Sequence, residues 1–267
     1  MDALATAQRL EEEFSGVPRQ LDFWGADVRG LSKCLANSAL FSVREKRAPR
    51  RRYDEEIIAS LNNVMMKYTG TQLDQDDHLV FMQLIHIART TPLGEAVTVD
   101  AAEALRGLGW SDSEESYDRL RDSYKRMLEG TVYVEDRKPK RWRLYGAHLI
   151  NTIAGDETAT GTRWSIVLDR SLARILTGNE LTLIDWVRQR RLSALAQWLH
   201  SFYATHAAPL PYKAATIYEL CGSKYANKAS FRQKLKKSLD ELIDERFIEG
   251  YEIGPRPGFL VAVKRAA

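Results

Sequence analysis

The stretch KASFRQKLKKSLDELI, residues 228–243, decides the fold. If it is helical, its apolar residues lie on one side and its polar and cationic residues lie on the other. The apolar side consists of Phe231, Leu235, Leu239 and Leu242. The opposite side is centred on Ser230, Gln233 and Lys237 and is flanked by Lys234 and Lys236. The stretch therefore predicts a helix that packs on a core with one face and offers cations on the other.

The residues around this helix predict a compact α+β unit. Apolar residues at helical spacing over 192–203 predict a helix that ends before Pro209, and residues 214–221 predict a shorter one. Downstream, residues 247–253 and 259–264 predict two strands, and the intervening GPRPG is typical of a hairpin loop.

The first half of the chain repeats this order. Asp100 and Ser113 are expected N-caps of a short and a long helix, and two hairpins are expected over 131–145 and 149–168. The apolar pattern around Leu120 recurs around Leu235 at an offset of 115 residues. Helix, short strand, short helix, turn, long helix and hairpin is the order of a winged helix, which is a helix-turn-helix with a hairpin wing.

We therefore expect an α+β protein with tandem winged-helix (helix-turn-helix) domains. The expected boundaries are an N-terminal arm over 1–52, a first domain over 53–178 and a second over 179–267. The alternative is a generic α+β fold whose two halves share only their apolar periodicity.

The composition limits the class of protein. A chain of 267 residues is long enough for two domains, and its formal net charge is only +3. Cys34 and Cys221 are far apart, which favours a reducing compartment over a disulfide scaffold. No apolar run approaches the ~20 residues of a membrane span, and the N-terminus lacks a signal sequence. We expect a soluble, cytoplasmic protein with no membrane partner.

The positive charge gathers in three runs, at residues 44–52, 137–143 and 221–237. In a helix-turn-helix the second helix presents base-reading side chains, and nearby cations contact phosphates. We expect Arg232 and Gln233 to read base edges, because arginine pairs with guanine and glutamine with adenine. The expected DNA contacts of the second domain are Lys224, Asn227, Lys228, Ser230, Arg232, Gln233, Lys236, Lys237 and the wing-tip Arg256.

The corresponding helix of the first domain carries mixed charge, including Glu115, Asp118 and Asp122. We expect its DNA contacts to come mainly from the following hairpin, which we interpret as its wing. The expected contacts are Arg119, Lys138, Lys140 and Arg141. A helix this acidic is also compatible with a protein partner, and that alternative stays open.

No catalytic motif is present in the sequence. A phosphate-binding GxxxxGK[ST] loop, HExxH, CxxC and GxSxG are all absent. Asp74, Asp76 and Asp77 fall at a helix start, where capping is favoured over metal binding. We expect no enzyme activity, no catalytic residue, no metal and no cofactor.

Several segments resemble the TrfA-type plasmid replication initiators. They are LANSALFS (35–42), YTGTQLDQDD (68–77), LIHIAR (84–89), IDWVRQRRLSALAQWLHSFYATHA (184–207), ELCGS (219–223) and FRQKLKKSLDEL (231–242). The resemblance implies sequence-specific binding to repeated sites, called iterons, in double-stranded plasmid origin DNA, followed by melting of adjacent DNA. It also implies recruitment of the host initiator DnaA, the replicative helicase and the sliding clamp, and a monomer–dimer equilibrium.

Residues Gln20, Leu21, Asp22, Phe23 and Trp24 are similar to the QL[SD]LF pentapeptide with which bacterial proteins enter the sliding-clamp pocket. The family carries such an element in this region, so the resemblance implies a clamp-binding element here. The alternative is that Phe23 and Trp24 dock on the first domain.

Two other functions remain open at this point. A transcriptional repressor with two winged helices would use the same DNA-binding surface without helicase or clamp partners. An interaction scaffold would use the winged helices to bind protein.

Overall fold

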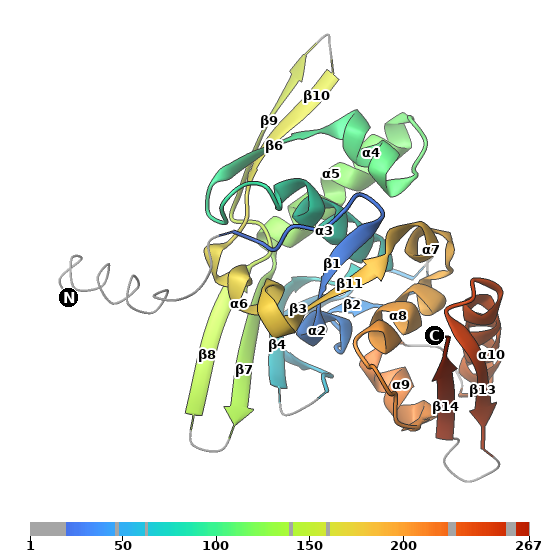
Figure 1. Cartoon of the computed structure of the whole chain (residues 1–267). Helices are drawn as coiled ribbons and strands as arrows, with labels where there is room; N and C mark the ends of the chain where they lie inside the picture. The colour runs from blue at the N-terminus through green and yellow to red at the C-terminus, as the bar shows by residue number, and fades with distance from the viewer. Residues whose placement is uncertain are drawn as a thin grey trace.

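A computed structural model describes residues 20–45, 48–61, 64–138, 141–158, 161–223, 228–254 and 260–266 (Figure 1). Within these ranges, side chains are described except for 136–138, 141–145, 156–158, 228 and 229. The described chain contains both helices and strands, in agreement with the α+β prediction.

The elements before residue 131 are β1 (Val28–Ser32), α2 (Lys33–Ala36), β2 (Phe41–Ser42), β3 (Arg52–Ile58), β4 (Val64–Thr71), β5 (Leu73–Asp74), α3 (Gln75–Ala88), β6 (Ala96–Asp100), α4 (Ala101–Leu108) and α5 (Glu114–Glu129). Those from residue 131 to residue 185 are β7 (Thr131–Lys138), β8 (Arg141–His148), β9 (Thr152–Thr158), β10 (Gly161–Val167), the 3-10 turns Arg170–Leu172 and Gly178–Glu180, α6 (Ala173–Leu176) and β11 (Leu181–Asp185). The remainder are α7 (Trp186–Arg191), α8 (Ala194–Ala204), β12 (Tyr212–Lys213), α9 (Ala214–Leu220), α10 (Lys228–Asp244), β13 (Ile248–Ile253) and β14 (Leu260–Arg265).

The expected helix caps are confirmed. The Asp100 carboxylate accepts a hydrogen bond from the Glu103 backbone N–H at 2.9 Å, and Ser113 caps α5 in the same way. Helix α4 ends at Gly109, whose φ of +71° is the left-handed conformation that glycine adopts without a Cβ penalty. The caps fix where each helix begins or ends, and so set the short turn between α4 and α5.

Two sets of elements follow one another in the same order. The first is α3, β6, α4, α5 and the hairpin β9–β10, and the second is α8, β12, α9, α10 and the hairpin β13–β14. Their three-stranded sheets have equivalent strand orders, β6-β10-β9 and β12-β14-β13, and all pairings in them are antiparallel. The two halves of the chain therefore share a topology as well as a periodicity.

This topology corrects one sequence interpretation. The hairpin of residues 131–148, expected as the first wing, is β7–β8 and belongs to the separate sheet β3-β4-β7-β8. The hairpin equivalent to β13–β14 is β9–β10. The sequence showed two consecutive hairpins after α5, and only the pairing of β10 with β6 shows which of them completes the unit.

The buried side chains form two hydrophobic cores. The last residue of the first core is Trp186. Apart from Val43, the buried residues of the second core all come from Leu192 onward. Residues 181–186 therefore pack with the first unit. The reason is strand β11, which pairs with β1 antiparallel over its whole length. The expected boundary between residues 178 and 179 lies before β11 and so assigns this strand to the second domain, whereas its pairing places it with the first unit.

Residues 20–45 of the expected arm are folded into the body of the protein. Leu31 is only 2% exposed, and Leu21, Trp24 and Phe41 lie in the first core as well. Its strands and helix span five residues or fewer, so each is too short to show a clear periodicity in the sequence. The interpretation of this segment as an arm was therefore wrong for residues 20–45.

We predict that Leu31→Ala lowers the free energy of unfolding by about 2–5 kcal/mol, because the truncation leaves a cavity in the first core. Phe23→Ala is the matched control, since Phe23 is 77% exposed and its truncation removes little buried surface. Urea unfolding followed by circular dichroism measures both. Equal midpoints for Leu31→Ala and wild type would contradict the integration of β1 into the core.

Candidate nucleic-acid interface

Helix α10 has the amphipathic character that the sequence predicted. Leu235, Leu239 and Leu242 are fully buried in the second core, and Phe231 is 3% exposed beside them. The side chains of Gln233, Lys236 and Lys237 are exposed, while Ser230 and Arg232 are partly exposed. The structure therefore brings these expected DNA-binding residues together on one accessible face.

The charge along α10 is polarised. Cations occupy the first half, whereas the acids Asp240, Glu241 and Asp244 follow in the second half. Two of these acids have partners: the Glu241 carboxylate accepts from the Ser193 backbone N–H at 2.9 Å, and Asp240 accepts from the Tyr251 hydroxyl at 2.8 Å. The positive charge of this helix thus lies near its N-terminal half, where a helix in the major groove contacts bases, and Lys234 there is ion-paired to Glu45 at 3.8 Å.

Some expected contacts cannot be placed on this face. Lys224, Asn227 and Arg256 lie outside the described residues. Lys228 is the first residue of α10, but its side chain is not described.

The equivalent helix α5 has the opposite charge. The exposed acids in and just before its first half are Asp112, Glu114, Glu115 and Asp118, and Asp122 follows at the start of its second half. Arg119, which was expected to contact DNA, is bound to Asp76 with an Nε–Oδ2 distance of 3.1 Å. Its guanidinium also lies 3.9 Å from the centre of the Trp110 ring. A phosphate approaching Arg119 would therefore compete with a carboxylate already in contact.

The other expected contacts of the first unit fall on β7–β8. Lys138 and Arg141 are directly paired across the two strands, and their side chains are not described. Lys140 lies outside the described residues. These residues are therefore placed only by their position on the hairpin.

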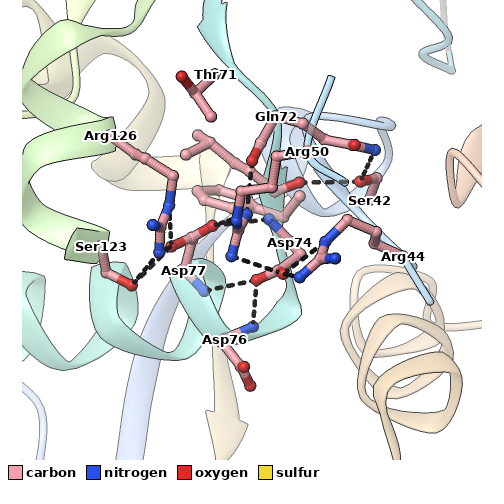
Figure 2. Close-up of polar contacts among 12 residues, drawn as sticks. Ser42, Arg44, Arg50, Thr71, Gln72, Asp74, Asp76, Asp77, Ser123 and Arg126 are labelled. Carbon is pink, nitrogen blue, oxygen red and sulfur yellow. Dashed lines mark hydrogen bonds and ion pairs between the residues drawn. The ribbon is translucent and has the colours of Figure 1, made fainter. Parts of the chain in front are cut away.

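The basic run at residues 44–52 has an internal role that the sequence did not reveal. Figure 2 shows Arg44 and Arg50 pointing at the start of α3, where Asp74 and Asp77 receive them. Arg50 bridges the two carboxylates, at 2.8 Å from Asp74 and 2.9 Å from Asp77. Two of the six cations in this run are thus neutralised by buried acids of the protein.

Asp77 is the centre of this cluster and is fully buried. Besides Arg50, it accepts hydrogen bonds from the Ser123 hydroxyl at 2.6 Å and from the Arg126 guanidinium at 2.7 Å (Figure 2). It also accepts from the Asp74 backbone N–H at 2.9 Å, completing a capping box at the start of α3. The sequence predicted the cap, but Arg50 and Arg126 are too distant in sequence from Asp77 to be recognised as its partners.

The electrostatics of Asp74 follow from the same arrangement. Burial alone raises the pKa of its carboxyl, but Arg50 and Arg44 outweigh burial and hold this pKa below its usual value. Asp74 is therefore ionised in the folded protein at neutral pH.

The core histidines do not form a site. Burial lowers the pKa of His78 to about 3, and burial with the nearby Arg188 lowers the pKa of His200 to about 3. His78 stacks on Phe41, and the His200 ring contacts the Gln189 side chain. Among the described residues, no group of three or more His, Cys, Asp or Glu side chains is arranged to hold a metal ion.

The clamp-like element at residues 20–24 is docked on the end of α3. Leu21 and Trp24 are each 3% exposed, and the Trp24 indole N–H donates to His86 Nδ1 at 3.0 Å. The Gln20 amide donates to the Arg89 carbonyl, and Asp22 is exposed. Phe23 is exposed, with its ring beside the Arg89 guanidinium. The alternative that both aromatic residues dock on the first domain therefore holds for Trp24 but not for Phe23. Clamp binding stays a prediction, and it would require Leu21 and Trp24 to leave the core.

With this geometry established, the chain can be compared with known proteins. The family described as "TrfA protein" matches residues 6–254. The chain belongs to the TrfA family. A curated relative, the plasmid replication initiator protein TrfA of Escherichia coli, is 27% identical over 229 residues. That match covers 85% of this chain and 59% of the relative, so this TrfA-family chain spans little more than half of the relative's length.

Two solved structures share the fold of this TrfA-family chain. A selenomethionine derivative of domains 2 and 3 of RctB has a TM-score of 0.57 at 13% identity, covering 85% of this chain and 95% of that one. A second structure of RctB domains 2–3 has a TM-score of 0.54 at 14% identity, covering 84% of this chain and 92% of that one.

In the described part of the chain, no helix is long and apolar enough to cross a membrane.

We predict that Asp77→Asn lowers the free energy of unfolding by about 3 kcal/mol, because it leaves Arg50 and Arg126 partly buried with less compensating charge. Asp118→Asn is the matched control, since its partner Arg121 is at the surface and exposed pairs contribute about 0–1 kcal/mol. Urea unfolding measures both changes. Equal effects of the two substitutions would show that the cluster is not a major source of stability.

We also predict that Asp74 makes stability depend on pH in the acid range. Because its pKa is lower in the folded than in the unfolded state, its contribution is complete above the unfolded value of about 3.9 and is lost as the pH falls through the folded value. Asp74→Asn keeps a good N-cap but removes the charge. The difference in melting temperature between wild type and Asp74→Asn should shrink from pH 5.5 to pH 2.5, and a constant difference would contradict this assignment.

Proposed function

We propose that this chain is a plasmid replication initiator that binds repeated duplex sites at an origin through its second unit. In this proposal both units are winged helices, α9 and α10 form the helix-turn-helix of the second, and β13–β14 is its wing. The observation that carries the proposal is the exposed, cationic first half of α10 on a helix whose other face is buried. Family membership supports the biological role.

The exposed face of α10 suits recognition in the major groove. Gln233 offers an amide that pairs with adenine, and Arg232 a guanidinium that pairs with guanine. Lys237 lies on the same side of the helix as Gln233, and Lys236 flanks it, so both lysines can neutralise phosphates without reading sequence. The opposite, leucine-rich face holds the helix rigidly on the second core.

Initiation would follow binding without chemistry by the protein itself. We propose that iteron-bound copies melt adjacent DNA and recruit the host initiator DnaA, the helicase and the clamp, in the bacterial cytoplasm where plasmid DNA lies. The related initiator from Escherichia coli supports this role. We propose no enzyme activity, metal or cofactor for these steps.

Selection of duplexes from a random library by the purified protein tests sequence-specific binding. We expect enrichment of one sequence that also occurs as direct repeats near the gene. A plasmid carrying that DNA should then replicate only in cells that make the protein. Regulated transcription without such replication would support the repressor alternative, and no enriched sequence would reject DNA recognition altogether.

We predict that Lys237→Glu weakens binding to the selected duplex at least tenfold and reduces the slope of log K against log salt by about 1, because one phosphate is no longer neutralised. Lys125→Glu is the matched control, since it makes the same charge change on an exposed position of α5. Fluorescence anisotropy at several salt concentrations measures affinity and slope. Equal weakening in the two variants would show that only total charge matters.

A further inference from the structure

Helix α7 connects the two units along the chain. It extends from Trp186 to Arg191; Trp186 lies in the first core, and Leu192, the residue after α7, lies in the second. In Figure 1, α7 lies between α4, which belongs to the first unit, and α10, which belongs to the second. The side chains of this short helix are therefore placed to contact both units.

The first residue of α7 is anchored in the first unit. The Trp186 side chain is 2% exposed, and its indole N–H donates to the Gly107 carbonyl at 2.8 Å. The Arg190 guanidinium donates to the same carbonyl at 3.3 Å. Gly107 lies in the last turn of α4, where the carbonyls have no partner within the helix. Helix α7 thus caps the C-terminal end of α4 and takes its position from the first unit.

The middle of α7 contacts the C-terminal end of α10. The Arg188 Nε donates to the Glu245 carbonyl at 2.9 Å, and Glu245 directly follows the last residue of α10. The same guanidinium lies 5.8 Å from the centre of the Phe247 ring. Just after α7, the Ser193 backbone N–H donates to the Glu241 carboxylate at 2.9 Å. The end of α10 is therefore held by α7 and the residue pair that follows it.

The sequence of α10 explains why its end requires a contact from outside the helix. Its last turn has no basic residue, and Glu241 and Asp244 place acids where the helix dipole is already negative. The helix is followed by Arg246, whose side chain is exposed and whose φ of +56° is the left-handed conformation that glycine usually adopts at a helix end. Arg188 supplies a donor and a partly buried cation at this end.

The two anchors of α7 are only two residues apart, on a capped helix. The Asp185 carboxylate accepts from the Arg188 backbone N–H at 2.9 Å, which fixes the start of α7. Gln189 is fully buried, and its amide lies 3.3 Å from the Ser201 hydroxyl of α8. Because these contacts hold α7 as one body, a displacement at Trp186 also displaces Arg188 and the end of α10.

We propose that Arg188 is a positioning residue for DNA recognition, which couples the first unit to α10 through α7. Arg188 acts on the backbone at the end of α10, and the side chains that read bases need an orientation within about 10–20° of the productive one. The inference rests on the proposed function and gives it a means of regulation. A ligand that displaces α4 changes the affinity of α10 for DNA, and DNA changes the affinity for that ligand by the same factor.

A double-mutant cycle across α7 tests this coupling. Trp186→Phe removes the indole donor at the first-unit end, and Arg188→Met removes the donor at the α10 end. The measured quantity is the preference, which is the ratio of the Kd for an unrelated duplex to the Kd for the selected duplex, from fluorescence anisotropy with the full-length chain. Each single variant should lower the preference about fivefold, and the double variant should lower it no further, because either change interrupts the same connection.

A second readout separates positioning from folding. Both single variants should bind the unrelated duplex with the affinity and salt slope of wild type, because the cations that contact phosphates are unchanged. Arg188→Lys should restore the preference, since a lysine ammonium can donate to the Glu245 carbonyl. Equal loss of affinity for both duplexes would show that the contact only keeps α10 folded, and it would overturn the inference.

Arg191→Met is the matched control, because it removes the same charge from the exposed last residue of α7. This variant should keep the wild-type preference. Wild-type preference in either single variant would overturn the inference, and so would effects that add in the double variant. Absence of any preference in wild type would reject the proposed function instead.

Discussion

The buried carboxylate of Asp77 is the constraint on which the first unit depends. Transferring a carboxylate out of water costs several kcal/mol, and only several well-aligned donors offset that cost. Asp77 obtains them from Arg50, Ser123 and Arg126, which come from the segment before β3 and from α5. One side chain therefore ties three distant parts of the chain together at the start of α3. If any one of these donors moved away, the Asp77 carboxylate would stay buried with fewer hydrogen bonds and less neighbouring positive charge.

The same segment transmits this constraint to the second unit. Phe41 packs in the first core, Val43 packs in the second, and Arg44 is ion-paired to Asp74. The Val43 backbone N–H donates to the Cys221 carbonyl at 2.7 Å, just before the turn that leads to α10. At that turn a Cβ on Gly222 would lie 2.8 Å from the Ser42 Cβ, so only glycine allows this approach. The direction in which α10 faces is thereby linked to the first unit.

The elements that the sequence predicted well are those with caps and long periodicities. Helices α5 and α10 and their apolar faces followed from local spacing, as did the Asp100 and Ser113 caps. What failed depended on contacts distant in sequence. Strand β1 is recognisable only through its pairing with β11, more than a hundred residues later, and β9–β10 only through the pairing of β10 with β6. For the same reason, the basic run at residues 44–52 looks solvent-facing in the sequence. Its partners Asp74 and Asp77 are more than twenty residues away, and only the structure shows these ion pairs.

Two equivalent helices of the chain carry opposite charge in their exposed first halves. Helices α5 and α10 occupy the same place in the same topology, yet the exposed first half of one is acidic and that of the other is cationic. A binding protein gains specificity both by attracting the correct partner and by repelling the wrong arrangement. In the proposed function, the acids of α5 oppose docking of DNA on the first unit's equivalent surface and favour an orientation along α10. If the proposal holds, the acids of α5 contribute to DNA recognition rather than weaken it, because they repel phosphates from the surface that the duplex does not use.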